Sequence, residues 1–212
     1  MLKKNLKIII LTSVVMLLPV IVGLVMWNKL PDKLPTHWNS SGEVDGWSSK
    51  SFAVFAIPLI LLGVHLLCSV GTSLDPKNKA VNSKIFFLVM WICPAVSVVC
   101  MTAVYAGALG VDVRVEFVIP LLMGLLFLVI GNYLPKCKQN YTIGIKIPWT
   151  LGDEDNWNKT HRFAGVVWTV CALVVMVGAF FKEIVVFTTF IPIAVMVFAP
   201  MIYSYIYYRK HR

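Results

Sequence analysis

The chain has 212 residues, of which 58% are hydrophobic and only 14% are charged, and its formal net charge is +9. A soluble domain carries about 25% charged residues, so this composition excludes an ordinary soluble globular protein. The apolar residues fall into runs long enough to cross a bilayer, since a hydrocarbon core of about 30 Å needs about 20 residues at about 1.5 Å each.

Six such runs follow one another, and none contains Asp, Glu, Lys or Arg. They are Ile8–Trp27, Phe52–Val70, Ile85–Ala106, Phe117–Leu134, Phe163–Phe181 and Ile184–Tyr205. The first holds 13 Ile, Leu and Val residues, which favour insertion by roughly 4–8 kcal/mol in total. One central Lys or Asp would cost about 2.5–3.5 kcal/mol. The sequence therefore predicts an all-α, polytopic membrane protein with six transmembrane helices.

The N-terminal run resembles a signal peptide in one respect, because Lys3, Lys4 and Lys7 precede it. However, signal cores span about 7–15 residues and end at a small-x-small cleavage site, which does not follow here. We expect the first run to be retained as a helix.

The first outer loop, Asn28–Ser51, is rich in turn formers and contains two tryptophans. The run Asn39-Ser40-Ser41-Gly42 predicts a hairpin that brings Trp38 and Trp47 together. Two interpretations fit this loop: a surface turn that packs on the membrane face, or a docking platform for an extracellular peptide. The candidate partner-binding residues are His37, Trp38, Gly42, Asp45 and Trp47. No second histidine is near His37, so we expect no metal site.

Inside the runs, His65 is the one classically ionisable group besides Tyr and Cys. Ionisable residues in a membrane are candidates for function. A proton relay would need a carboxylate inside the membrane, and the runs have none, so a histidine hydrogen-bonded to a neighbouring helix is favoured. Prolines interrupt most runs and predict kinks from ordinary packing, with a hinge or cavity as the alternative. They are Pro19, Pro58, Pro94, Pro120, Pro192 and Pro200. The five cysteines show no metal-binding spacing and are expected to be structural.

The long inner loop, Pro135–Arg162, carries the most specific pattern. Apolar residues alternate with other residues from Tyr141 to Ile147, which predicts an extended segment that ends at Pro148. Thr150 fits an N-cap, followed by acidic residues in the first turn of a helix that continues into the fifth span.

Several polar and aromatic side chains gather in and beside this loop. Glu154, Asn158, His161 and Arg162 are expected near one helix face, and Trp157 lies one turn before His161. A capped interfacial segment with tryptophan anchors explains part of the pattern; a cytosolic site for a partner explains more of it. The candidate residues are Asn132, Asn140, Gly144, Lys146, Pro148, Trp149, Thr150, Asp153, Glu154, Trp157, His161 and Arg162.

Orientation follows from the basic residues of the loops. With six spans, 14 of the 19 basic residues fall on the side of the two termini. Both termini and the loop between the fourth and fifth helices are therefore predicted to be cytoplasmic. The positive charge is an orientation signal, and no direct contact with nucleic acid is expected. We expect one membrane domain, with a four-helix region at 1–134, the inner loop at 135–162 and a two-helix hairpin at 163–212.

Specific motifs resemble the sporulation-delaying-protein immunity family, the SdpI-like bacterial membrane proteins. They are Gly131-Asn132, Gln139-Asn140, Ile143-Gly144-Ile145-Lys146, Pro148-Trp149-Thr150-Leu151, Asp153-Glu154, Trp157 and Arg162-Phe163. The outer-loop stretch LPTHWNSSGEVDGW is similar to an N-terminal module frequent in that family.

The resemblance implies a six-helix protein of the bacterial cytoplasmic membrane that gives resistance to a secreted, membrane-active peptide toxin. The best-known member also holds a transcriptional repressor at the membrane, which would assign the outer loop to the toxin and the inner loop to the repressor. Membrane lipid is the remaining expected partner. The alternatives are a transporter of small solutes or ions that uses His65, and a membrane enzyme that uses Asp153, Glu154 and His161 at the cytosolic face. No motif of a nucleophile, a metal site or a phosphate loop supports an enzyme, so neither catalysis nor a cofactor is expected.

Overall fold

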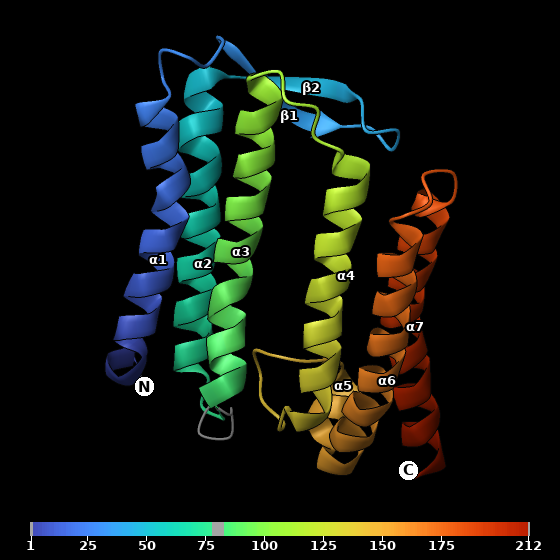
Figure 1. The fold of residues 1–212 in the computed structure, drawn as a ribbon. Coiled ribbons are helices and arrows are strands. Elements are labelled where there is room, and N and C mark those ends of the chain that lie inside the picture. Colours follow the sequence, from blue (N-terminus) through green and yellow to red (C-terminus); the bar gives the residue numbers. More distant parts are fainter. Residues whose placement is uncertain (1, 78–82, 212) are drawn as a thin grey trace. The chain divides into compact units, whose positions relative to one another are not determined.

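The computed structural model describes residues 2–77 and 83–211, and it is mainly helical (Figure 1). The part of the inner loop Gly71–Lys84 that falls on residues 78–82 lies outside the described residues. The elements are α1 (Leu2–Val25), β1 (Lys33–Trp38), β2 (Val44–Ser49), η1 (Phe52–Ala56), α2 (Ile57–Leu74), α3 (Ser83–Ala108), α4 (Val115–Tyr133), η3 (Leu134–Lys136), α5 (Pro148–Gly152), α6 (Glu154–Gly178) and α7 (Val185–Lys210).

Among the described residues, six helices are long and apolar enough to cross a membrane. The predicted six-span, all-α membrane protein is therefore confirmed. The fifth of these helices begins at Glu154, so it includes the polar turns before Phe163, as the sequence predicted. The cytoplasmic placement of the termini stays a prediction, as does the expected division at residues 134 and 162.

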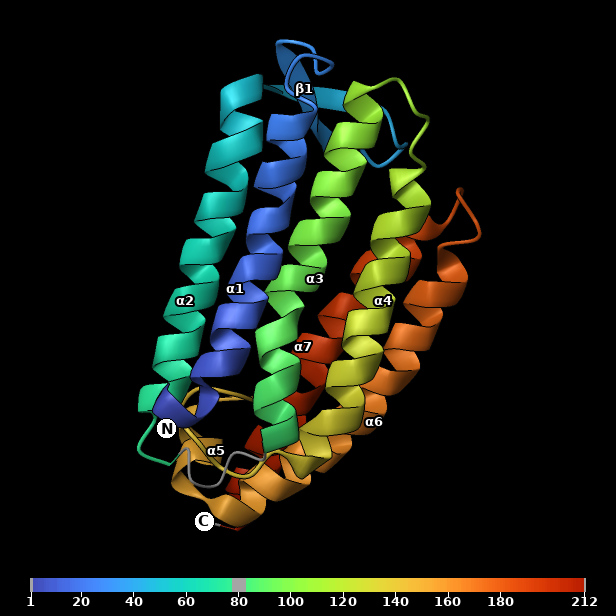
Figure 2. The same ribbon diagram turned by 60° about the vertical axis from the view of Figure 1, so that its left-hand side comes forward.

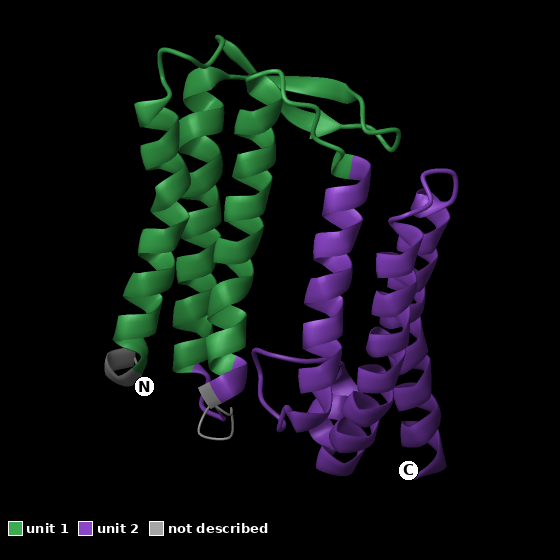
Figure 3. Ribbon diagram, in the orientation of Figure 1, with its two compact units in different colours: residues 1–74, 86–115 green, residues 75–85, 116–212 purple. Residues whose placement is uncertain are grey.

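The chain forms two compact units (Figure 3). Unit 1 consists of Met1–Leu74 and Phe86–Val115, and unit 2 consists of Asp75–Ile85 and Glu116–Arg212. In unit 1, α1, α2 and α3 lie side by side, and the hairpin of β1 and β2 lies at the end where α1 stops and α2 begins (Figures 1 and 2).

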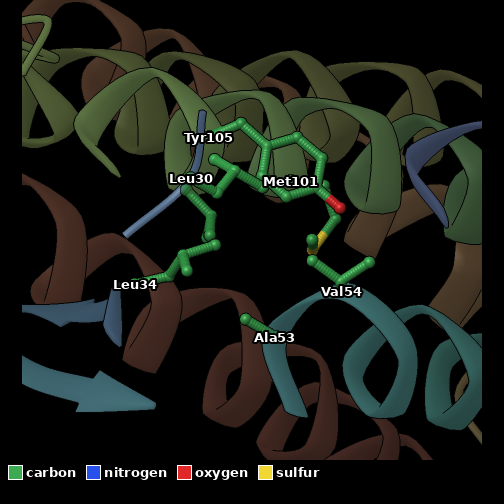
Figure 4. Packing of buried hydrophobic residues seen from close by; sticks show 7 residues of the cluster. Leu30, Leu34, Ala53, Val54, Met101 and Tyr105 are labelled. Carbon is green, nitrogen blue, oxygen red and sulfur yellow. The ribbon is translucent and has the colours of Figure 1, made fainter. Parts of the chain in front are cut away.

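A buried cluster fixes the hairpin to the helices of unit 1. Leu34 of β1 is fully buried with Leu30, Val54, Met101 and Tyr105, from the neighbouring turns and helices (Figure 4). Burying a side chain such as leucine stabilises by about 1.5–3 kcal/mol, because it removes apolar surface from water. The cluster therefore anchors β1 at this end of the bundle.

The predicted hairpin is present, but its two tryptophans do not face each other. Pro35 pairs with Trp47, and Trp38 pairs with Val44. The Asn39 side-chain oxygen accepts hydrogen bonds from two backbone N–H groups of the turn, which explains why the chain reverses there. Trp38 packs against the buried cluster, whereas Trp47 is 57% exposed. The expected meeting of Trp38 and Trp47 was therefore wrong.

His65 lies fully buried in unit 1. Its Nε2 atom is 2.9 Å from the Thr12 hydroxyl of α1, and that hydroxyl also donates to the carbonyl oxygen of Ile8 at 2.8 Å. Since the Thr12 hydroxyl donates its proton to the Ile8 carbonyl oxygen, the Nε2 atom of His65 is the protonated ring nitrogen and donates to the Thr12 oxygen. This arrangement matches the expected histidine hydrogen-bonded to a neighbouring helix.

In unit 2, α6 and α7 pack as antiparallel neighbours, joined by a tight connection that contains the predicted turn at Lys182-Glu183. Fully buried Asn156 of α6 links them: its amide nitrogen donates to the Ser204 carbonyl at 3.1 Å, and its oxygen accepts from the Ser204 hydroxyl at 2.6 Å. The short helix α5 and the segment before it lie where α4 ends and α6 begins (Figures 1 and 2).

Candidate functional site

The inner segment, defined here as residues 137–153 of unit 2, is not an extended strand. Tyr141 to Gly144 form bends, Ile145 to Ile147 have no regular secondary structure, and Gly144 has a φ of +116°. Pro148 begins the short helix α5 and does not end an extended run. The alternating pattern therefore predicted the wrong conformation.

The helix cap was also assigned to the wrong residue. Thr150 lies inside α5, and its hydroxyl donates to the carbonyl oxygens of Ile145 and Ile147 at 2.8 and 2.9 Å. The N-cap of α6 is Asp153, whose carboxylate accepts from the backbone N–H of Asp155 at 2.9 Å. The predicted acidic first turn is confirmed for Glu154 and Asp155.

Asn140 organises the start of the segment. It is fully buried, and its oxygen accepts from the backbone N–H groups of Thr142 and Ile143 at 2.9 and 2.7 Å. Its nitrogen donates to the carbonyl oxygens of Lys138 and Ile143 at 2.8 and 2.9 Å. One side chain thus satisfies four backbone groups that a strand would have paired with another strand, which explains the bends.

Asp75 and Lys77, which follow α2 in the chain, bind the inner segment through their side chains. The Asp75 carboxylate is buried and accepts from the Tyr141 backbone N–H at 2.8 Å and the Thr142 hydroxyl at 2.9 Å. Lys77 donates to the Gln139 side-chain oxygen at 2.8 Å and lies 4.9 Å from the centre of the Tyr141 ring. Hydrogen bonds to a charged group stabilise by about 1.5–3 kcal/mol, so these contacts fix the segment strongly.

A stacked pair of side chains on α6 packs against the inner segment. The ring centres of Trp157 and His161 lie 4.0 Å apart, and the Trp157 indole nitrogen donates to the Cys137 carbonyl oxygen at 2.7 Å. His161 Nε2 accepts from the Ile145 backbone N–H at 3.0 Å, so its Nδ1 carries the proton and donates to the Trp157 carbonyl oxygen at 2.8 Å. Both ring nitrogens are therefore used for structure in the neutral histidine. A Cβ atom at Gly144 would lie 2.5 Å from Nε2, which explains the glycine.

Cys137 is buried at the start of the inner segment. Burial raises the pKa of its thiol to about 11, although the hydrogen bond from Asn140 acts in the opposite direction. A nucleophilic cysteine needs a lowered thiol pKa. Burial therefore keeps Cys137 as a neutral thiol that packs within the segment.

Trp149 of α5 lies against two tyrosines of α7. Its ring centre is 5.4 Å from that of Tyr205 and 6.1 Å from that of Tyr208. These contacts join α5 to the end of α7 and leave the tryptophan half-buried.

The exposed side chains of the site form a separate group. Glu154, Asn158 and Arg162 are exposed at spacings of four on α6, whereas His161 is buried, so only three of the four residues expected on one face share it. Lys146 and Pro148 are also exposed. Asn132 is exposed on α4, outside the inner segment.

On the outer hairpin, His37 Nδ1 lies 2.5 Å from an Asp45 carboxylate oxygen, and both side chains are exposed. Gly42 adopts a positive φ of 82° in the turn. Residues 2–77 and 83–211 contain no group of three or more His, Cys, Asp or Glu side chains that could hold a metal ion.

Sequence reasoning missed four residues that shape the site. Asp75 was detectable only as the single acidic residue in the basic loop Gly71–Lys84. The role of Lys77 depends on its contact with Gln139, 62 positions away, which no local pattern indicates. Gln139 belongs to a motif but was not selected as a candidate binding residue. Asn156, buried between α6 and α7, was not selected because polar residues are ordinary in the first turns of such a helix.

Comparisons with known proteins agree with the resemblance seen in the sequence. The model of the SdpI/YfhL protein family matches residues 136–204, and the model of a domain of unknown function, DUF1648, matches residues 14–62. The chain is 27% identical over 209 residues to the Immunity protein SdpI of Bacillus subtilis (strain 168), which covers 98% of this chain and 97% of that protein. No solved structure matches the chain. The SdpI-like resemblance and a multi-pass location in the cytoplasmic membrane are thereby confirmed.

Proposed function

We propose that this chain is an immunity protein of the cytoplasmic membrane that protects a cell against a secreted, membrane-active peptide. The near-full-length similarity to the Immunity protein SdpI carries this proposal. It includes both the outer hairpin, within the match at 14–62, and the inner segment, within the match at 136–204. Protection of this kind acts by binding and needs no catalytic group.

The outer hairpin is the proposed site for the peptide. The exposed Trp47 offers a large apolar surface, and the exposed pair of His37 and Asp45 lies on the same hairpin. Aromatic side chains are frequent anchors at interfaces, because they bury much area in few contacts. The basic residues of the loops support an extracellular position for this hairpin.

The exposed residues of the inner segment are the proposed site for a cytosolic partner, a transcriptional repressor held at the membrane. Lys146, Glu154 and Arg162 supply charges of both signs on a surface that the buried hydrogen bonds hold in one conformation. A pre-organised surface binds with a smaller loss of conformational entropy, which favours a recognition role.

Survival of a sensitive strain tests the proposal. A Bacillus subtilis strain that lacks its own immunity protein would express this chain and be exposed to the sporulation-delaying peptide. We expect survival with the intact chain and loss of survival with Trp47→Ala. Ser49→Ala, an exposed change on the same strand, is the control. No protection at a verified membrane level of the intact chain would overturn the proposal.

The cytosolic role is tested separately. Glu154→Ala and Arg162→Ala are expected to leave survival intact and to abolish co-purification of a repressor with membranes that contain the chain. Retention of the repressor by both variants would contradict the assignment of this surface.

A further inference from the structure

We propose that the free edge of β2 binds the peptide as an added strand, with the backbone N–H and C=O groups of Trp47 as its first hydrogen-bonding partners. This inference rests on the proposed function and names the form in which the peptide is recognised, an extended segment. It is carried by the register of the hairpin, the proline of β1 and the exposure of Trp47. All three features lie within unit 1.

The register of the hairpin decides which backbone groups point away from the partner strand. The Lys50 N–H donates to the Asp32 carbonyl oxygen at 2.8 Å, so these two residues form a hydrogen-bonded pair. In an antiparallel ladder, such pairs alternate with pairs whose backbone groups point outward. Counting back along β2 from Lys50, every second residue bonds to β1, which includes Ser48 and excludes Trp47.

Pro35 supports this assignment independently, because it lies opposite Trp47 and has no backbone N–H. Two residues cannot exchange both backbone hydrogen bonds when one of them lacks the donor. The hydroxyls of Thr36 and Ser48, 2.9 Å apart, also hold the two strands in this register. Outside the regular helices and strands of the described chain, no backbone–backbone hydrogen bond uses Trp47. Both of its backbone groups are therefore available to another strand.

The two edges of the sheet formed by β1 and β2 (Figure 1) differ in what they offer to another strand. On β1, Pro35 is buried against the end of α3, where a Cβ atom at Gly107 would lie 3.2 Å from the proline ring. Proline on an edge cannot donate a hydrogen bond and so hinders pairing. On β2, exposed residues alternate with half-buried ones and none is buried. The edge of β1 is therefore blocked, whereas that of β2 can accept a strand.

The side chain of Trp47 determines which residue of the peptide fits opposite it. It is 57% exposed, and the residue directly opposite on an added antiparallel strand has its Cβ about 4.5–5.5 Å away. Aromatic and β-branched residues make favourable cross-strand pairs with an aromatic residue. Membrane-active peptides carry apolar and aromatic residues on the face that enters the bilayer. We therefore expect an extended segment of the peptide with an apolar residue opposite Trp47.

The open edge of β2 is short. The register shifts on both sides of His37, near the turn of the hairpin, and at the other end the chain enters a helix at Lys50. Regular pairing with an added strand is thus limited to the stretch from Trp47 to Ser49. Short and irregular edges hinder the pairing of identical chains, which favours the peptide over a second copy as the occupant.

Proline substitutions test the use of the backbone groups. Trp47→Val and Trp47→Pro both remove the indole ring, but only Trp47→Pro removes the N–H that points outward. Binding of the sporulation-delaying peptide would be measured on membranes that contain the full-length chain. We expect the dissociation constant of Trp47→Pro to be about tenfold higher than that of Trp47→Val. Equal dissociation constants overturn the proposal.

Lys33 provides the matched control on the other edge. Its backbone groups also point outward, because it pairs with Ser49, and its side chain is exposed. Lys33→Pro and Lys33→Val should therefore bind the peptide equally. A loss of binding confined to Lys33→Pro would place the peptide on β1 and overturn the assignment to β2.

Cross-linking tests the conformation of the bound peptide without any proline. A full-length chain with Ser49→Cys, whose own five cysteines are alanine, would be oxidised with peptide variants that each carry one cysteine. A strand presents every second residue to one face, so the cross-linking positions should be two residues apart. Positions three and four residues apart would indicate a bound helix, and cross-links between two chains without peptide would indicate a second copy on this edge. Either result overturns the proposal.

Failure of the proposed function is seen separately, as absence of protection by the intact chain in the survival assay. An incorrect binding mode leaves that protection in place. It changes only the comparison of proline with valine at Trp47 or the spacing of the cross-links.

Discussion

Gly144 supports the sharpest prediction, because two independent observations require a glycine there. Its φ of +116° is one that L side chains rarely adopt, and a Cβ atom would lie 2.5 Å from His161 Nε2 and 3.0 Å from two atoms of the Trp157 ring. The backbone conformation alone costs an alanine about 1–3 kcal/mol. Displacing the ring of His161 also breaks its hydrogen bond to the backbone N–H of Ile145. Leaving this buried donor unpaired costs about 1–3 kcal/mol. Gly144→Ala should therefore open the inner segment by at least about 2 kcal/mol.

The opening is measurable at Cys137, whose carbonyl oxygen accepts from Trp157. A loss of about 2 kcal/mol raises the population of an open segment about 30-fold, so labelling by N-ethylmaleimide of a chain whose other four cysteines are alanine should accelerate by about that factor. Gly152→Ala is the control, since a Cβ there meets nothing within 4 Å and its φ is not positive. Equal labelling of Gly144→Ala and the unsubstituted chain would refute the argument from the close contacts.

Three further predictions concern other buried polar groups. Asn156→Ala should lower the melting temperature in detergent by several degrees, because it removes three buried hydrogen bonds, whereas the exposed Asn158→Ala should not; equal melting temperatures would contradict the role of Asn156. Since the pKa of the Cys137 thiol is raised to about 11 and maleimide reacts with the thiolate, labelling should keep rising as the pH increases from 9 to 11; a plateau near pH 9 would count against the burial of this thiol. Replacing both members of the buried pair, His65→Leu with Thr12→Val, should preserve survival in the toxin assay; loss of survival at normal abundance would revive the transporter alternative.

The membrane spans were predictable because the cost of placing charge in lipid applies to each segment of the chain separately. A run of about 20 residues without charge inserts whatever the rest of the chain does, so each of the six could be judged alone. The hairpin was predictable for a similar reason, since the Asn39 side chain bonds to the turn that follows it. The separation of Trp38 from Trp47 was not, because it depends on the register of the strands and on the cluster that buries Leu34.

The conformation of the inner segment was not predictable, because side chains replace the pairing that local patterns assume. Asn140 satisfies the backbone groups that would otherwise have favoured a strand between Tyr141 and Ile147. Thr150 and Asp153 both fit a helix cap, and only the fold shows that the Thr150 hydroxyl donates to the carbonyl oxygens of Ile145 and Ile147. The Asp75 anchor joins residues that are 66 and 67 positions apart, a separation that leaves no periodic signal.

The motif residues of the inner segment divide into two groups with different tasks. The buried group uses its polar atoms or its backbone within the chain: Asn140, Gly144, Thr150, Trp157 and His161. Substitutions in this group act on any partner through the shape of the segment, and they should therefore change Cys137 labelling and partner retention together. Lys146 is exposed but donates to the Thr142 carbonyl oxygen at 3.0 Å. The exposed group of Glu154 and Arg162 can meet another molecule, so substitutions there should change retention while labelling stays constant. If the segment binds a partner, substitutions in the exposed group alone will change partner retention without changing Cys137 labelling. If the segment is purely structural, no substitution will change retention without also changing labelling.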